Sequence, residues 1–324
     1  MTHAIRVHEY GGPEVMKWET VDVPAPGPGQ ALIRHTAVGL NYIDTYQRTG
    51  AYPQPSLPFT LGMEGAGEVL AVGKGVKNVK PGDQIAYAGA IGSYSEERVI
   101  PADRLVKRPK GVSDKQAAAM MLQGMTARYL LRKTYKVKDG TVMLFHAAAG
   151  GVGLIACQWA KHLGATVIGT AGSREKCDLA KKHGCKHVIN YREEDFVERV
   201  KEITKGKGVD VVYDSVGKDT WPTSLDCLKP RGLLVSFGQS SGAIAPVNLG
   251  ILAQKGSLYL TRPTLQTHIA SREDLEETAK DLFKVVDKGI VKLRVNQTFP
   301  LSEAVAAHRA LEGRQTTGST VLIP

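Results

Sequence analysis

The chain has 324 residues, of which 42% are hydrophobic and 23% charged, the balance of an ordinary globular protein rather than a disordered or collagen-like one. Its formal net charge of +10 leaves acidic partners open. Its four cysteines all lie from Cys157 onward, which excludes a disulfide scaffold. The length predicts about two domains. Because the sequence contains neither a basic-then-apolar leader nor an apolar window of membrane-spanning length, we expect a cytoplasmic protein with no membrane partner.

The first 120 or so residues are predicted to form a compact, mostly β domain. Residues 31–38 and 67–73 have the composition of strands, and residues 24–29 form a turn-rich connection. This part of the sequence lacks a regular alternation of strands and helices.

From about residue 124, apolar runs alternate with helical segments. The runs are residues 141–146, 166–170, 187–190, 209–214, 232–237 and 257–261. The first connecting helix is the clearest, because its apolar residues recur at spacings of three and four from Val152 to Leu163, and Gly164 provides a stop. This rhythm predicts an α/β fold with a doubly wound, parallel, six-stranded sheet.

After Pro263 the alternation of apolar runs with helical segments ends. We expect a helix to begin at Ser271, a strand near residues 291–298, a helix after Ser302 and a last strand at residues 319–323. About 60 residues are few for an independent core, so this segment is predicted to pack on the first domain. The predicted domain boundaries are residues 1–123 and 265–324 for the β domain and residues 124–264 for the α/β domain.

Residues 147–153 join the first strand of the α/β domain to its helix and carry a dinucleotide-binding fingerprint, with Ala148 in place of the first glycine. Small residues here let a pyrophosphate approach the backbone amides at the helix N-terminus, and let the helix pack close to the strand. The predicted contacts are Gly150, Gly151, Val152 and Gly153. A tight turn without a ligand is the alternative, which the five strand-like runs that follow disfavour.

The end of the second strand distinguishes the two nicotinamide cofactors. Sites for NAD hold an acidic residue about 20 residues past the glycines, whereas this chain has Gly172 and Ser173, with Lys176 close behind. A hydroxyl and a cation accept a 2′-phosphate, so we predict NADPH, although Glu175 argues against it. Ser173 is also a candidate helix N-cap, and the two roles are compatible. Tyr191 is expected to flank the adenine or to bond the same phosphate.

Residues 61–83, with Met63 among closely spaced glycines, resemble the signature of the medium-chain dehydrogenase/reductase superfamily. Its zinc-dependent members have a histidine at the position of Met63 and a cysteine near Asn41. A thioether and a neutral amide are poor zinc ligands, so we expect no metal. One further cluster is interpreted as surface and packing residues because it straddles a helix end and a strand start. Its members are Cys177, His183, Cys185 and His187.

Five segments along the whole chain together resemble the quinone oxidoreductase and zeta-crystallin branch of that superfamily. They are residues 39–50, the Met63 segment, and residues 147–153, 212–217 and 236–238. The resemblance implies NADPH-dependent reduction of a quinone or related electrophile, a GroES-like β domain, a Rossmann domain and a homodimer. It also implies that one segment lines the nicotinamide, namely Asn41, Tyr42, Ile43, Asp44, Thr45 and Tyr46.

Other cofactor contacts are expected from the same resemblance and from their place in the fold. Thr126 and Tyr129 lie one helical turn apart, and Arg314 is the implied extra cation for the 2′-phosphate. The remaining residues follow predicted strands, at the carboxyl edge where open α/β sheets bind ligands. They are Val216, Phe237, Gly238, Gln239, Ser240, Ser241, Pro263, Thr264 and Leu265.

Without a metal to polarise the acceptor, hydrogen bonds and solvent must stabilise the developing anionic oxygen. Tyr46 and Tyr52 are the predicted catalytic phenols, which orient the acceptor or donate a proton. Reduction of the activated double bond of an alkenal or enone is an alternative that the sequence leaves open, as it does the choice between one-electron and two-electron transfer.

Two expectations concern partners. A basic stretch keeps an RNA-binding role open, but no stacking motif accompanies it and we do not favour it. Its members are Arg128, Arg132, Lys133, Lys136 and Lys138.

Residues 257–261 are expected to form the outer strand of the sheet, whose apolar edge would pair with a second copy of the chain.

Overall fold

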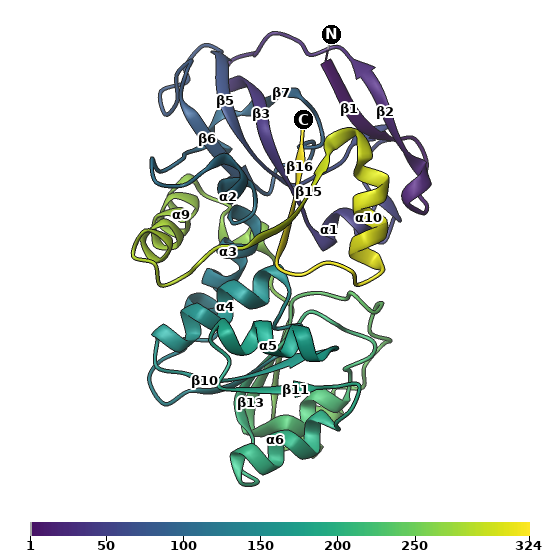
Figure 1. Cartoon of the computed structure of the whole chain (residues 1–324), viewed down its shortest axis with the longest axis vertical. Helices are drawn as coiled ribbons and strands as arrows, with labels where there is room; N and C mark the ends of the chain where they lie inside the picture. The colour runs from purple at the N-terminus through teal and green to yellow at the C-terminus, as the bar shows by residue number, and fades with distance from the viewer. Residues whose placement is uncertain (1) are drawn as a thin grey trace. The chain divides into compact units, whose positions relative to one another are not determined.

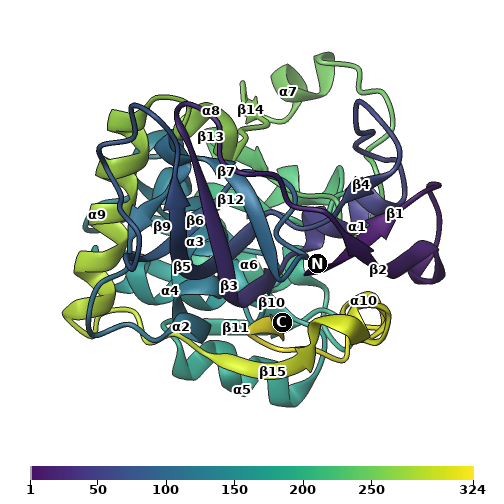
Figure 2. The same cartoon turned by 90° about the horizontal axis from the view of Figure 1, so that it is seen from above.

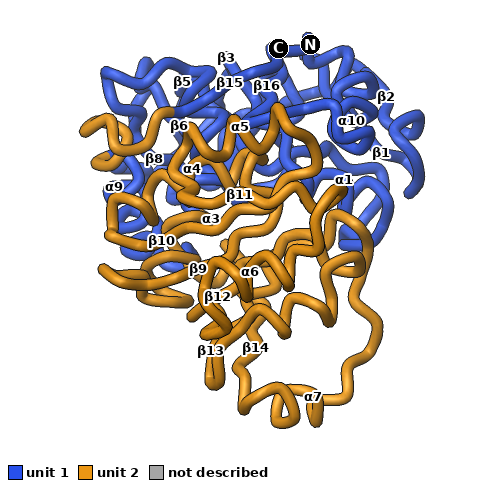
Figure 3. Tube along the Cα trace, turned by 60° about the horizontal axis from the view of Figure 1, so that its bottom comes forward, with its two compact units in different colours: residues 1–125, 269–283, 293–324 blue, residues 126–268, 284–292 orange. Residues whose placement is uncertain are grey.

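The computed structural model describes residues 2–324, which form two compact units (Figure 3). Unit 1 comprises Met1–Met125, Ile269–Phe283 and Leu293–Pro324, and unit 2 comprises Thr126–His268 and Lys284–Lys292. The predicted C-terminal segment, residues 265–324, is therefore divided between the two units. No helix within residues 2–324 combines the length and hydrophobicity that a membrane span requires.

Unit 2 contains the predicted six-stranded parallel sheet, in the order β11-β10-β9-β12-β13-β14. Its strands are β9 (Val142–Phe145), β10 (Thr166–Ala171), β11 (His187–Asn190), β12 (Val209–Asp214), β13 (Leu228–Ser236) and β14 (Tyr259–Thr261). Helices α4 (Gly151–His162) and α5 (Arg174–Lys182) lie on one face, and α6 (Phe196–Thr204) lies on the other (Figure 1). The doubly wound fold is confirmed.

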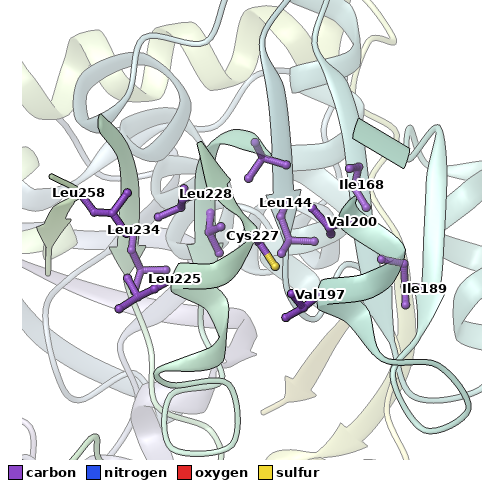
Figure 4. Packing of buried hydrophobic residues seen from close by; sticks show 12 residues of the cluster. Leu144, Ile168, Ile189, Val197, Val200, Leu225, Cys227, Leu228, Leu234 and Leu258 are labelled. Carbon is purple, nitrogen blue, oxygen red and sulfur yellow. The ribbon is translucent and has the colours of Figure 1, made fainter. Parts of the chain in front are cut away.

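The face of the sheet that α6 covers is closed by apolar side chains (Figure 4). Leu144 and Ile168 from the strands meet Val200 from the helix, and each is fully buried. Helix α6 begins where the Asp195 carboxylate accepts the N–H groups of Val197 and Glu198, as an N-cap does. This core fixes the strand ends from which the loops of the site emerge.

Unit 1 is built mainly of antiparallel strands. A three-stranded sheet has the order β2-β1-β4, and a seven-stranded sheet has the order β15-β16-β3-β5-β6-β8, with β7 paired to β3. The strands are β1 (Thr2–Val7), β2 (Met16–Val21), β3 (Gln30–Leu40), β4 (Phe59–Thr60), β5 (Glu64–Val72), β6 (Gln84–Ala88), β7 (Glu97–Pro101), β8 (Val106–Lys107), β15 (Val295–Pro300) and β16 (Ser319–Ile323). Strand β3 runs antiparallel beside β5 (Figure 2), and the C-terminal strand β16 pairs with β3.

Several element bounds differ from the predictions. The strand predicted at residues 67–73 is Glu64–Val72, so it begins three residues earlier and includes Gly65 within the sheet. The strand predicted near residues 291–298 is Val295–Pro300. The helix predicted to begin at Ser271 is confirmed, since the Ser271 hydroxyl accepts the N–H of Asp274 at 3.0 Å.

The remaining helices and helical turns connect these strands. They are η1 (Pro13–Val15), α1 (Tyr42–Arg48), η2 (Ala102–Arg104), α2 (Asp114–Ala118), α3 (Met121–Tyr129), η3 (Leu130–Thr134), η4 (Thr223–Cys227), α7 (Gly250–Gln254), α8 (Leu265–His268), α9 (Arg272–Asp287), η5 (Leu301–Glu303) and α10 (Ala304–Glu312). Helix α3 begins in unit 1 and ends in unit 2.

Candidate active site

The loop between β9 and α4 has the close packing that its small residues predict. A Cβ atom on Gly153 would lie 2.6 Å from the Ala147 carbonyl oxygen and 2.7 Å from that of Ala148, so only glycine fits there. The Ala148 N–H donates to the Thr170 carbonyl at 3.0 Å, which ties the loop to β10. Helix α4 therefore starts directly against the ends of two strands.

The N-terminus of α4 is open to an anion. Its N-cap is Gly150, no side chain caps the helix, and its first turn holds no acidic residue. The first N–H groups of a helix lack partners within the helix, and the helix dipole favours negative charge there. Gly151 and Val152 supply amides in this turn. These residues fit the pyrophosphate of a dinucleotide.

The ends of β10 and β11 bring three of the predicted residues together. A Cβ atom on Gly172 would lie 2.4 Å from the Tyr191 phenol oxygen, so the phenol lies over the backbone of Gly172. Ser173 is the N-cap of α5, where its hydroxyl accepts the N–H of Lys176 at 3.3 Å. Arg314 is exposed on the turn after α10 in unit 1, with φ of 58°, and its role stays a prediction.

Two loops at the carboxyl ends of β12 and β13 are bound to each other. The N–H of Ser240 donates to the Ser215 carbonyl at 3.0 Å, and the N–H of Ser241 donates to the Val216 carbonyl at 2.9 Å. A Cβ atom on Gly238 would lie 2.8 Å from the Ser215 carbonyl oxygen. The loops that carry Val216 and residues 238–241 therefore form one rigid surface.

Asp214 anchors this surface, and the sequence analysis did not identify it. One carboxylate oxygen accepts the N–H groups of Val216 and Gly217 at 2.7 and 3.1 Å, and the other accepts the Thr220 hydroxyl at 2.6 Å. Its place at the end of an apolar strand, three residues before a glycine, is the signal that could have found it.

Arg262 at the end of β14 is a second residue that the sequence analysis missed. Its guanidinium donates to the Ser236 hydroxyl and to the Gln239 side-chain carbonyl, each at 2.9 Å. It therefore holds the loop after β13. The predicted residues beside it follow directly: Pro263, then Thr264, whose hydroxyl lies 3.0 Å from that of Thr267, then buried Leu265.

Thr126 and Tyr129 are buried on α3, 7% and 2% exposed. The Tyr129 ring stacks on that of His268, with centroids 4.4 Å apart and an interplanar angle of 5°. Burial raises the pKa of Tyr129, so its phenol stays protonated at neutral pH.

The Phe237 ring packs against that of Phe145, with centroids 5.7 Å apart.

In unit 1, the predicted nicotinamide-lining segment forms α1 and divides between two faces. Asp44 and Thr45 are buried, 0% and 3% exposed, and the Asp44 carboxylate accepts the N–H of Asn41 at 2.9 Å in a capping box. Tyr42, Ile43 and Tyr46 are partly exposed.

The two predicted phenols lie together. The rings of Tyr46 and Tyr52 meet edge to face with centroids 5.1 Å apart, and the Tyr42 ring lies 5.5 Å from that of Tyr46. The N–H of Tyr52 donates to the Tyr46 carbonyl at 2.9 Å, which fixes the loop after α1 against the helix. Burial and then the Glu312 carboxylate raise the pKa of Tyr42. Neutral phenols can donate a hydrogen bond to an acceptor oxygen.

The positions of the zinc ligands in zinc-dependent relatives are part of a packed interior. Met63 and Asn41 are each 4% exposed. Within residues 2–324, no group of three or more His, Cys, Asp or Glu side chains is arranged to hold a metal ion. In the cysteine and histidine cluster, the His183 imidazole lies 2.7 Å from the Leu179 carbonyl oxygen, and Cys185 is buried.

A buried hydrogen-bond network in unit 1 joins α1 to α10 and contains Asp44, whose pKa is raised. The Tyr94 hydroxyl donates to Asp44 at 3.0 Å and lies 3.1 Å from Nε2 of His308. Arg48 donates to Nδ1 of His308 and to both carboxylate oxygens of Glu312. Burial raises the pKa of Asp44 to about 7 and lowers the pKa of His308 to about 3.

Comparisons with known proteins cover the whole chain. Residues 27–110 match the family described as alcohol dehydrogenase GroES-like domain, and residues 151–285 match that described as zinc-binding dehydrogenase. Quinone oxidoreductase 1 of Escherichia coli is 55% identical over 100% of both chains, and 2-haloacrylate reductase of a Burkholderia species is 48% identical over 100% of this chain and 99% of its own. A crystal structure of E. coli quinone oxidoreductase complexed with NADPH is 55% identical, covers 99% of this chain and 100% of its own, and has a TM-score of 0.98.

Proposed function

Because this chain belongs to the quinone oxidoreductase branch of the medium-chain dehydrogenase/reductase superfamily, we propose that it is an enzyme that reduces quinones with NADPH. The observation that carries this proposal is the phosphate loop of α4 in a chain that matches, over its whole length, a quinone oxidoreductase crystallised with NADPH. The open helix N-terminus and the Gly172–Ser173 corner suit the diphosphate and the 2′-phosphate of that cofactor.

When bound, NADPH supplies the hydride, and a proton from solvent or a phenol completes the conversion of quinone to hydroquinone. The chain's own groups bind the phosphates, orient the two reactants and donate hydrogen bonds to the acceptor oxygen. We assign that donation to Tyr46 and Tyr52, whose rings are in contact. In this proposal, hydrogen bonds to the acceptor oxygen supply its polarisation.

A second candidate substrate is an activated alkene. The relative named 2-haloacrylate reductase is 48% identical over nearly the whole of both chains, and an electron-poor C=C bond accepts the same hydride as a quinone. NADPH oxidation should be measured with benzoquinone, naphthoquinone, 2-chloroacrylate and a small enone. We expect the higher kcat/KM with the quinones. A higher kcat/KM with the alkenes would replace the quinone proposal.

We also propose a homodimer formed through the edge of the unit 2 sheet. Strand β14 is the last strand of that sheet, and Tyr259 on it is 61% exposed. An apolar edge strand with free backbone groups favours pairing with a second copy.

A further inference from the structure

Glu64 is a fully buried carboxylate at the start of β5, and its two oxygens have different partners. One oxygen accepts the side-chain N–H of Asn41 at 2.7 Å. The other accepts the backbone N–H of Leu122 at 2.8 Å, in the first turn of α3. Glu64 therefore connects the residue that precedes α1 to the start of α3.

The network continues beyond Asn41. The side-chain amide of Gln123 donates to the side-chain carbonyl of Asn41 at 3.1 Å, and the Ser319 hydroxyl donates to the Gln123 carbonyl at 2.6 Å. Both ends of the Asn41 carboxamide are therefore engaged. In this arrangement Glu64 accepts from the Asn41 NH₂ group while Gln123 donates to the Asn41 carbonyl, so the two neighbours together fix the orientation of the amide.

The backbone leaves space for this carboxylate. A Cβ atom on Gly39 would lie 2.4 Å from an oxygen of Glu64 and 2.1 Å from the Ala118 carbonyl oxygen. Only glycine at this position of β3 allows both the carboxylate and the end of α2 to pack where they do.

A role in stability alone explains Glu64 poorly. Burial raises the pKa of Glu64 to about 8, so its carboxyl group is mostly protonated at neutral pH, and burying it still costs free energy that its hydrogen bonds must offset. A buried hydrogen-bonded pair can often be replaced by apolar groups of the same shape without loss of stability. The role of Glu64 is then to orient the Asn41 side chain and the start of α3 through its two hydrogen bonds.

We propose that Glu64 is a positioning residue for hydride transfer, which orients the Asn41 side chain and the first turn of α3 together. Helix α3 carries Thr126 and Tyr129 one and two turns further on, and Asn41 is the residue before α1. The inference rests on the proposed function, because these residues are the predicted lining of the nicotinamide. A change at Glu64 alters the geometry of the reacting ring, while the phosphate loop of α4 continues to hold the cofactor.

The test is the substitution Glu64→Gln. A glutamine can still accept from Leu122, but its NH₂ group then faces the NH₂ group of Asn41, so the Asn41 amide must turn, and its bond to Gln123 persists only if the Gln123 amide turns as well. We expect NADPH affinity close to that of the wild type, a kcat lowered about tenfold or more and a larger primary isotope effect with deuterated NADPH. The emission of bound NADPH should also shift, because it reports the surroundings of the nicotinamide. Glu68→Gln, on the same strand and partly exposed, should change none of these.

Two further variants strengthen the test. Asn41→Asp combined with Glu64→Gln restores an acceptor opposite each donor, so it should recover part of the wild-type emission. Ser319→Ala removes the outermost bond of the network, together with the contact of the same hydroxyl with the Ala119 carbonyl at 3.2 Å. It should give a smaller change in the same direction, which keeps the test valid if Glu64→Gln does not fold.

A folded Glu64→Gln protein with wild-type NADPH emission, kcat and isotope effect would overturn the inference. If Glu64→Gln does not fold, wild-type values of the same three quantities in Ser319→Ala would overturn it. A wild-type protein that binds NADPH but reduces no acceptor would instead refute the proposed function, and the emission measurements would still decide the role of Glu64.

Discussion

The phenol oxygen of Tyr191 lies 2.4 Å from the point that a Cβ atom on Gly172 would occupy. This contact brings the end of β11 over the end of β10, beside the N-cap residue of α5. The corner contains a hydroxyl and a nearby lysine where NAD-dependent proteins hold an acid.

We therefore predict that Ser173→Asp reverses the preference for NADPH. Aspartate caps a helix as well as serine does, so α5 should persist, while the new carboxylate repels the 2′-phosphate. The dissociation constant for NADPH should rise about tenfold or more, and that for NADH should not rise. Cofactor fluorescence titration measures both. Ser113→Asp, at the N-cap of α2, is the matched control, and equal weakening of both cofactors would count against the assignment.

Gly153→Ala should impair cofactor binding. Its methyl group would lie within 2.7 Å of two carbonyl oxygens, so α4 must move away from the loop. Such overpacking costs about 1–3 kcal/mol of stability, and the displacement of the first amides of α4 from the pyrophosphate should raise the NADPH dissociation constant about tenfold. Gly111→Ala, where a Cβ atom meets nothing within 4 Å, should bind normally. Unchanged affinity in Gly153→Ala would show that the cofactor binds elsewhere.

Replacing Tyr46 and Tyr52 by phenylalanine should lower kcat by about tenfold or more while leaving the NADPH dissociation constant unchanged. The rings and their edge-to-face contact remain, so only the hydroxyl groups are removed. Steady-state kinetics with each accepted quinone and enone measure the effect. Wild-type turnover of every acceptor by the double variant would exclude proton donation and orientation by these phenols.

The buried Asp44 carboxyl predicts a pH-dependent stability. Its pKa is about 7 in the folded protein against an ordinary value of 3.8, because burial disfavours the charged form. Between these values the folded protein holds a proton on Asp44 that the unfolded chain has released, so the contribution of Asp44 to the free energy of unfolding falls as pH rises from about 4 to 7. This contribution is of the order of a few kcal/mol. The lowered pKa of His308 acts in the opposite direction between about pH 3 and 6.5. Urea unfolding at several pH values measures the difference in free energy of unfolding between the wild type and Asp44→Asn, which should fall as pH rises from about 4 to 7, and parallel curves would contradict the assignment.

Tyr259→Lys should weaken the proposed dimer. The substitution places a charge on an exposed edge strand, where lysine opposes strand pairing. Light scattering at micromolar concentration should show a lower mass for this variant than for the wild type. Leu57→Lys, at an exposed apolar position of unit 1, should keep the wild-type mass. A monomeric wild-type protein would refute the dimer.

The α/β fold and the phosphate loop could be predicted because their determinants are local. Buried parallel strands are continuous apolar runs, and the loop between β9 and α4 needs small residues at fixed spacing. Ser173 was predicted as a cofactor contact and as an N-cap, and the structure confirms the N-cap.

The interior of unit 1 could not be predicted in this way, because its contacts join distant parts of the chain. Arg48 bonds Glu312, 264 residues away, and Ser319 bonds Gln123, 196 residues away. No spacing pattern indicates such pairs. Glu64 lies within the signature segment, residues 61–83, but nothing in that segment indicates its partners Asn41 and Leu122.

The most direct test of the proposed chemistry is NADPH oxidation by protein dialysed against a chelator, with benzoquinone as acceptor. We predict one NADPH consumed for each quinone reduced, at the same rate before and after chelation. No turnover, or turnover that returns only when zinc is added, would contradict a metal-independent NADPH:quinone oxidoreductase.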